Sequence, residues 1–165
     1  MKRKKIFKRI LLIILILFVA IQFIRPAKNT SEGINPHDIS TRYPVPDSIQ
    51  AILKVACNDC HSNNTRYPWY AEIQPVGWWL SGHIKDGKRA LNFSEFTSYR
   101  IRKQFHRMDD INEQLKEDEM PLGSYTIIHK DAVLTPAQKN ALLNWTSAIK
   151  DSIRAHYPPD SLLKK

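Results

Sequence analysis

The stretch ACNDCHSN, residues 56–63, contains the only two cysteines of the chain, Cys57 and Cys60, and places His61 directly after the second. Three kinds of site use two cysteines separated by two residues: a redox disulfide, a structural zinc site and covalent haem attachment. Each requires a different fold and different partner residues. The rest of the 165 residues therefore has to discriminate among them.

A zinc site is the weakest of the three interpretations, because it needs four ligands that usually come as two close pairs. The histidines after His61 are single and about twenty residues apart, and no second pair follows. A redox pair of the thioredoxin type follows a strand and opens a helix in a βαβ unit. Here the pair follows a predicted helix, so a thiol–disulfide oxidoreductase without haem remains only as an alternative.

Covalent haem attachment is the specific match, because C-x-x-C-H is its signature. The thiols of Cys57 and Cys60 would add across the two vinyl groups of the haem, and His61 would be the proximal iron ligand. We therefore predict one haem c per chain, covalently attached.

The sixth iron ligand decides the chemistry of a haem. Met120 is the leading candidate, because it lies in an irregular segment and is followed by Pro121, which stiffens the loop. Met108 lies on a helical apolar stripe and is expected to fill the core. His83, on the apolar face of another predicted helix, is the alternative ligand.

The N-terminus predicts a membrane anchor. Residues 2–9 carry six positive charges and no acid, and residues 10–24 contain only one polar residue, Gln22. A helix over 6–24 would measure about 28 Å, close to a hydrocarbon core of about 30 Å. Basic flanks stay in the cytoplasm, so we expect a single-pass inner-membrane protein with a periplasmic or extracytoplasmic domain. A cleaved signal peptide is the alternative, although no A-x-A-like site follows.

The charge distribution argues against nucleic acid as a partner. The N-terminal cluster accounts for six units of the formal net charge of +9, and the remaining Lys and Arg residues are dispersed. No basic stripe is interleaved with aromatic residues, as a nucleic-acid site requires. We divide the chain into a basic tip and anchor (1–25), a Pro-containing linker (26–47), a haem-binding domain (48–158) and a tail (159–165).

The apolar spacing in the domain is helical throughout, so we predict an all-α fold. Helices are expected over 48–56, 76–89 and 94–116, the last capped by Ser94. A final helix is expected from residue 136, because Thr135, Pro136 and Gln138 form a capping box with proline at the first position. The predicted architecture is a cytochrome c-like helical domain around a covalent haem, preceded by one transmembrane helix.

The motifs "CNDCHSNNTRYPWY", "GWWLSGHIKDGKRALNFSEF", "MPLGSY" and "LT…LLNW", in that order, resemble the small haem-binding domain family of membrane-anchored bacterial proteins. The resemblance spans roughly residues 37–155, and the chain is more loosely similar to class I cytochromes c. It implies attachment through Cys57 and Cys60, with His61 as proximal and Met120 as distal ligand. Many members have Met-Pro-Pro where this chain has Met-Pro-Leu.

These observations favour a membrane-tethered carrier of single electrons that exchanges them with redox partner proteins. A haem sensor or peroxidatic enzyme with an open or labile sixth site is the main alternative. The sequence offers no Ser/His/Asp arrangement, phosphate-binding glycine loop or carboxylate pair. It therefore favours an electron carrier or haem-binding protein over a catalyst.

Overall fold

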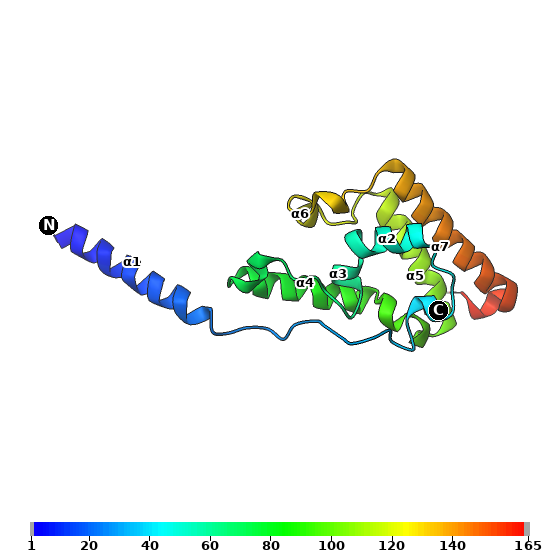
Figure 1. Ribbon diagram of the computed structural model, residues 1–165, viewed down its shortest axis with the longest axis horizontal. Coiled ribbons are helices and arrows are strands. Elements are labelled where there is room, and N and C mark those ends of the chain that lie inside the picture. The colour runs from blue at the N-terminus through cyan, green and yellow to red at the C-terminus, as the bar shows by residue number, and fades with distance from the viewer. Residues whose placement is uncertain (1, 164–165) are drawn as a thin grey trace.

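We analysed a computed structural model that describes residues 2–163. In this range the chain forms α-helices, short 3₁₀ turns and loops, and no β-strand (Figure 1). The helices are α1 (Lys2–Ile21), α2 (Asp47–Ala56), α3 (Asn58–His61), α4 (Val76–Ala90), α5 (Ile101–Lys116), α6 (Gly123–Thr126) and α7 (Pro136–His156). The helical class is as predicted from the apolar spacing.

The body of the protein is built on α5 and α7, which pack against each other, with α2 lying across α7 (Figure 1). α3 follows α2 almost directly and packs on α4. The largest fully buried core side chains are Phe96, Met108, Leu142 and Ile153. This arrangement brings the segment that contains both cysteines against the main helical core.

α7 begins as its sequence predicts. The Thr135 side chain accepts a hydrogen bond from the backbone N–H of Gln138 at 3.2 Å, and the Gln138 side chain accepts one from the backbone N–H of Thr135 at 2.8 Å. Together they satisfy two N–H groups at the helix start, which would otherwise lack partners. The buried face of α7 includes Leu142, Trp145 and Ile149.

The helix predicted over 94–116 begins at Ile101 instead of near Ser94. Residues Phe93–Ser98 form a separate 3₁₀ turn, and the side chain of Asn92 caps it by accepting a hydrogen bond from the backbone N–H of Ser94 at 3.0 Å. Phe93 and Phe96 are both buried in this turn. A 3₁₀ turn has three residues per turn, so it places residues at i and i+3 on one side.

The predicted transmembrane helix is not found. No helix within residues 2–163 is both long enough and apolar enough to cross a membrane. α1 includes all six cations of the basic cluster and ends at Ile21, so its uncharged part, 10–21, measures only about 18 Å. The predicted single-pass inner-membrane placement depended on this helix and is wrong.

The segment that follows α1 is bound to the body of the protein. The side chain of Gln22 accepts a hydrogen bond from the backbone N–H of Gln74 at 2.8 Å and donates one to its carbonyl at 3.1 Å. The indole N–H of Trp78 donates to the carbonyl of Ile24 at 2.7 Å. These bonds attach the end of α1 to the start of α4.

A small ionic cluster continues this attachment. Arg25 and Lys28 each lie 2.7 Å from a carboxylate oxygen of Glu72. The hydrogen bond from Lys28 and the two positive charges lower the pKa of Glu72. Because the groups are exposed, each ion pair contributes little to stability.

Candidate functional site

The two cysteines and His61 lie on one short helical turn. α2 ends at Ala56, and the carbonyl of Cys57 then accepts hydrogen bonds from the backbone N–H groups of Cys60 at 3.2 Å and His61 at 2.9 Å. Residues three and four positions apart in a helix lie on the same side. The turn therefore directs Cys57, Cys60 and His61 toward one side of α3.

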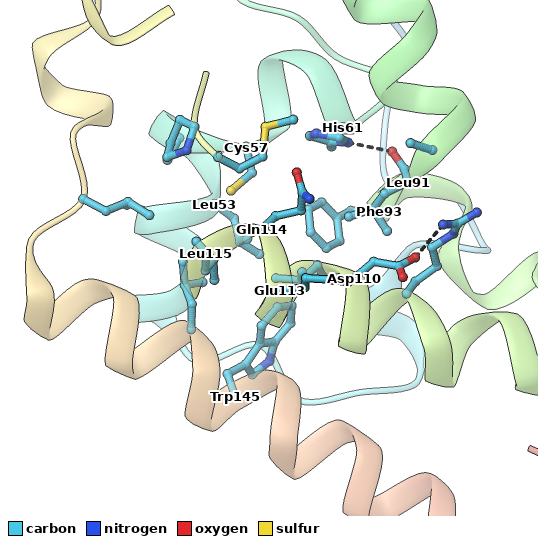
Figure 2. Close-up of a pocket in the computed structure, with 18 residues that line it drawn as sticks. Leu53, Cys57, His61, Leu91, Phe93, Asp110, Glu113, Gln114, Leu115 and Trp145 are labelled. Atoms are coloured by element: carbon cyan, nitrogen blue, oxygen red, sulfur yellow. Dashed lines mark hydrogen bonds and ion pairs between the residues drawn. The ribbon is translucent and has the colours of Figure 1, made fainter. Parts of the chain in front are cut away.

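The imidazole of His61 is held by two backbone carbonyls. Its Nδ1 lies 3.0 Å from the oxygen of Gly87 and 3.0 Å from the oxygen of Leu91, both at the end of α4. Figure 2 shows the contact with Leu91. A carbonyl only accepts, so Nδ1 must carry the proton and Nε2 is left with a free lone pair. Burial lowers the pKa of His61, which keeps the ring neutral. A neutral ring fixed in this way is the usual form of a metal-binding histidine.

A glycine allows α4 to approach the cysteine turn. A Cβ added at Gly87 would lie 2.7 Å from the carbonyl oxygen of Cys60 and 3.1 Å from its Cβ. Any other residue would push α3 away from α4. The close contact places the Gly87 carbonyl beside His61.

A cavity of about 340 Å³ lies beside His61, between α2, α5, α7 and the loop after α5 (Figure 2). This volume is at the lower end of the range for cofactor pockets, about 300–1,000 Å³. The lining residues are Leu53, Ala56, Cys57, His61, Ala90, Leu91, Phe93, Arg107, Asp110, Ile111, Glu113, Gln114, Leu115, Met120, Pro121, Leu134, Leu142 and Trp145. Most of them are apolar, as a haem pocket requires.

The structure brings most of the predicted site residues together. Cys57, His61 and Met120 all line the cavity, and Cys60 lies in the same turn without lining it. The alternative ligand, His83, does not line the cavity; its ring packs edge-on against Trp79, with 4.3 Å between ring centroids.

The two thiols are free and poorly suited to redox exchange. Burial raises the pKa of Cys57 to about 12 and that of Cys60 to about 11, with the charge of Asp59 adding to the shift at Cys60. Both thiols therefore remain protonated at neutral pH. Redox C-x-x-C pairs have a reactive thiolate with a lowered pKa, so this environment does not support the oxidoreductase alternative.

Sequence analysis missed Asp59, which lies between the cysteines and is almost fully buried. Its carboxylate accepts hydrogen bonds from the backbone N–H of Arg66 at 2.9 Å, from the Arg66 guanidinium at 3.3 Å and from the hydroxyl of Tyr125 at 2.7 Å. Burial and the bond to Asp59 raise the pKa of Tyr125. A polar residue at a variable position of the motif gives no local signal of such distant partners.

Tyr125 links the cysteine turn to the loop that carries Met120. It belongs to α6, five residues after Met120, and its ring stacks on His129 with centroids 4.2 Å apart. The ring of His129 is itself hydrogen-bonded to the hydroxyl of Tyr70 at 2.8 Å. The loop is thus attached at one point to Asp59 and at another to the aromatic residues before α4.

The haem-binding domain family matches residues 16–148, which is most of the chain and includes the whole cavity. The chain belongs to this haem-binding domain family. Neither the curated proteins nor the solved structures contain a significant match.

Membership of the haem-binding domain family supports a haem cofactor, and the residues at the cavity have the chemistry that this cofactor requires. Nε2 of His61 is available to iron, and Cys57 borders the apolar space in which the macrocycle would lie. The part of the chain that the structure describes has no cluster of three His, Cys, Asp or Glu side chains able to hold a metal ion by itself. Iron held within a macrocycle needs only axial ligands from the protein.

Proposed function

We propose that the chain holds one haem c through thioether bonds to Cys57 and Cys60. Each S–H adds across a vinyl group, so that sulfur bonds to one carbon and the hydrogen goes to the other, and neither an oxidant nor a reductant is consumed. The observation that carries the proposal is the orientation of His61. Two carbonyls fix its Nδ1 proton, which leaves Nε2 free to bind iron, and His61 belongs to the same turn as both cysteines.

Met120 is the proposed distal ligand. It lines the same cavity as His61 but comes from a different element, the loop after α5. Its residue is only partly buried, so the thioether is not a filler of the apolar core, whereas Met108 is fully buried there. His83 is a weaker candidate, because its ring packs on Trp79 outside the cavity.

A haem with histidine and methionine ligands has no open coordination position, so it changes oxidation state without binding a substrate. Methionine ligation also raises the reduction potential. We therefore propose single-electron transfer with redox partner proteins as the function. No other constellation of residues at the cavity suggests catalysis of a bond-breaking reaction.

A sensor or peroxidatic function is the second candidate, and the loop of Met120 is the observation that favours it. The backbone N–H of Met120 lies 3.4 Å from the carbonyl of Gln114, a long hydrogen bond. Release of the sulfur would open the sixth position to small ligands. The two candidate functions predict different ligand binding. In an electron carrier an added ligand must displace Met120 from the iron, whereas in a sensor or peroxidatic enzyme it binds without this competition.

The first test is the absorption spectrum of the full chain after co-expression with haem-attachment machinery, before and after denaturation in alkaline pyridine. Haem that stays with the denatured chain and gives a c-type spectrum is the expected result. The double variant C57A/C60A should lose the haem on denaturation. A wild-type chain that carries no attached haem, and whose cysteines titrate as thiols or form a disulfide, would contradict the proposal.

The distal ligand is tested in the same preparation by the weak near-infrared sulfur-to-iron band of the ferric protein. Met120→Ala should abolish this band and admit imidazole or cyanide at lower concentration. Met108→Ala is the matched control, because it removes a thioether from the core and should leave the band unchanged. A band that survives in Met120→Ala would exclude this residue as the ligand.

A further inference from the structure

The cavity has one positively charged lining residue, Arg107, whose hydrogen bonding is incomplete. Its Nε is one of two buried side-chain nitrogen or oxygen atoms without a hydrogen-bond partner among residues 2–163; the other belongs to Asn58, away from the cavity. Buried polar groups almost always have partners. Nε is too closely covered by protein for a ligand to reach it, and the donor that remains is Nη2, which is not buried and has no hydrogen bond among residues 2–163.

The guanidinium is already fixed on one side. Nη1 of Arg107 donates to a carboxylate oxygen of Asp110 at 2.5 Å, one turn further along α5 (Figure 2). In Figure 2, Asp110 of this ion pair lies at the edge of the cavity across from Cys57. Because Asp110 occupies Nη1 and Nε is covered by protein, Nη2 is the donor that is available to a second acceptor.

The polar lining of the cavity is concentrated on one helix. Arg107, Asp110, Glu113 and Gln114 all belong to α5, whereas α2 and α7 contribute mainly apolar side chains. The one indole N–H of the lining, that of Trp145, donates to the carbonyl of Pro44 at 2.9 Å and is satisfied. A planar ligand with one apolar edge and one anionic edge would thus turn its anionic edge toward α5.

Arg107 is also the only positively charged residue on this wall. Asp110 and Glu113 are acidic and repel an anion, and Gln114 offers only an uncharged amide donor, so a carboxylate is attracted most strongly to the guanidinium. Arginine presents N–H donors in a rigid planar fork that matches the two oxygens of a carboxylate. Carboxylates are the groups that haem carries on the edge opposite its vinyl groups.

We propose that Arg107 binds a propionate of the haem through its Nη2, and that Asp110 orients the guanidinium for this contact. The inference rests on the proposed haem site, because Cys57 and Cys60 determine which edge of the macrocycle faces α5. Arg107 is thus a cofactor-binding residue, and Asp110 is a positioning residue. The pair would fix the rotation of the haem in the cavity and offset the charge of the propionate.

The test is resonance Raman spectroscopy of the haem-loaded full chain. The propionate bending band is measured, because its frequency responds to hydrogen bonding at the carboxylate. Arg107→Gln should shift this band and lower the reduction potential, because a positive charge next to the haem is lost. We expect a change of roughly tenfold in the redox equilibrium constant, ~59 mV for one electron. Arg102→Gln is the matched control, since Arg102 lies on the same helix, outside the cavity, near the carbonyl of Leu163.

Arg107→Lys separates the hydrogen bond from the charge and serves as the second variant if Arg107→Gln yields no loaded protein. Arg107→Lys should shift the Raman band, because the planar fork of donors is lost. The positive charge remains, so the redox equilibrium constant should stay within about threefold of the wild-type value. A band unchanged in both variants, with haem content equal to wild type by the pyridine assay, would overturn the inference. A wild-type chain without attached haem would instead overturn the proposed function, so the two failures are distinguishable.

Discussion

The two sides of the cavity are held in different ways. On the side of His61, α3 packs on α4 with no side chain between them at Gly87, and two carbonyls hold the imidazole. On the side of Met120, a loop follows α5 and is attached to the rest of the site by the hydroxyl of Tyr125. One side is helix packed directly on helix, and the other is a loop with few attachments.

This difference implies different roles for the two ligands. The orientation of His61 is determined by the backbone of α4, so it exists before any cofactor is bound. The position of Met120 depends on side-chain contacts of a loop, which cost less to break. Under the proposed function, retention of the haem would thus depend on the first side, and closure of the sixth position would depend on the second.

The largest effect is expected from Gly87→Ala. Its Cβ would meet the carbonyl oxygen of Cys60, and neither backbone can yield without separating α3 from α4. Overpacking of this kind costs about 1–3 kcal/mol, and loss of the bond from His61 to Gly87 adds about 1 kcal/mol. We expect a loss of about 3 kcal/mol in the free energy of unfolding, measured by urea denaturation of the haem-loaded chain.

Gly82→Ala is the matched control within the same helix. A Cβ at Gly82 meets no atom within 4 Å, so alanine brings only its higher helix propensity. We expect a gain of up to about 1 kcal/mol. Equal stability changes at the two glycines would mean that the contact between α3 and α4 is not what holds His61.

A smaller effect is expected from Tyr125→Phe, which keeps the ring and removes the hydroxyl. The carboxylate of Asp59 then loses one of its donors while it remains buried, which costs about 1–3 kcal/mol. The loop of Met120 also loses its bond to the cysteine turn. We therefore expect imidazole to bind the ferric haem about tenfold more tightly, as measured by optical titration.

Tyr67→Phe is the control for this prediction. The hydroxyl of Tyr67 accepts a hydrogen bond from the backbone N–H of Asn29 at 2.7 Å, far from the loop of Met120. Its removal should lower stability without changing the affinity for imidazole. Unchanged affinity in Tyr125→Phe would indicate that the bond to Asp59 does not restrain the distal ligand.

Local patterns in the sequence were sufficient for the elements that depend on neighbours in the chain. The capping box of Thr135 and Gln138 defines the start of α7, and the C-x-x-C-H motif lies on one helical turn because its residues are three and four apart. The contacts of Asp59 with Tyr125 and of Gly87 with Cys60 join residues 27–66 positions apart. No local spacing encodes such contacts, so they could not be predicted.

The N-terminus shows the opposite error, in which a local pattern was extended too far. The predicted transmembrane helix extended from Ile6 to Ile24. This range includes the charged residues Lys8 and Arg9 and continues beyond the end of α1. In the structure the helix stops at Ile21, and Gln22 forms two hydrogen bonds with Gln74. The attachment proposal therefore depends on the C-x-x-C-H motif, the family match and the geometry of the cysteine turn, and not on a membrane anchor.

The smallest effect is expected at Asp118, in the turn where the Met120 loop leaves α5. Asp118 has a φ of 59°, and the next residue, Glu119, donates its backbone N–H to the carbonyl of Gln114 at 3.0 Å, which ends α5 in a Schellman-type turn. Asp118→Ala and Asp118→Gly both remove the exposed ion pair with Lys139, but only glycine adopts this backbone conformation without strain.

We therefore expect Asp118→Gly to be more stable than Asp118→Ala by about 1 kcal/mol in urea denaturation. If the turn also sets the position of Met120, the alanine variant should bind imidazole more tightly than the glycine variant. If the two Asp118 variants bind imidazole equally well despite their different stabilities, the contact of Tyr125, and not this turn, restrains the Met120 loop. The loop would then have one controlling contact, against the several that hold His61.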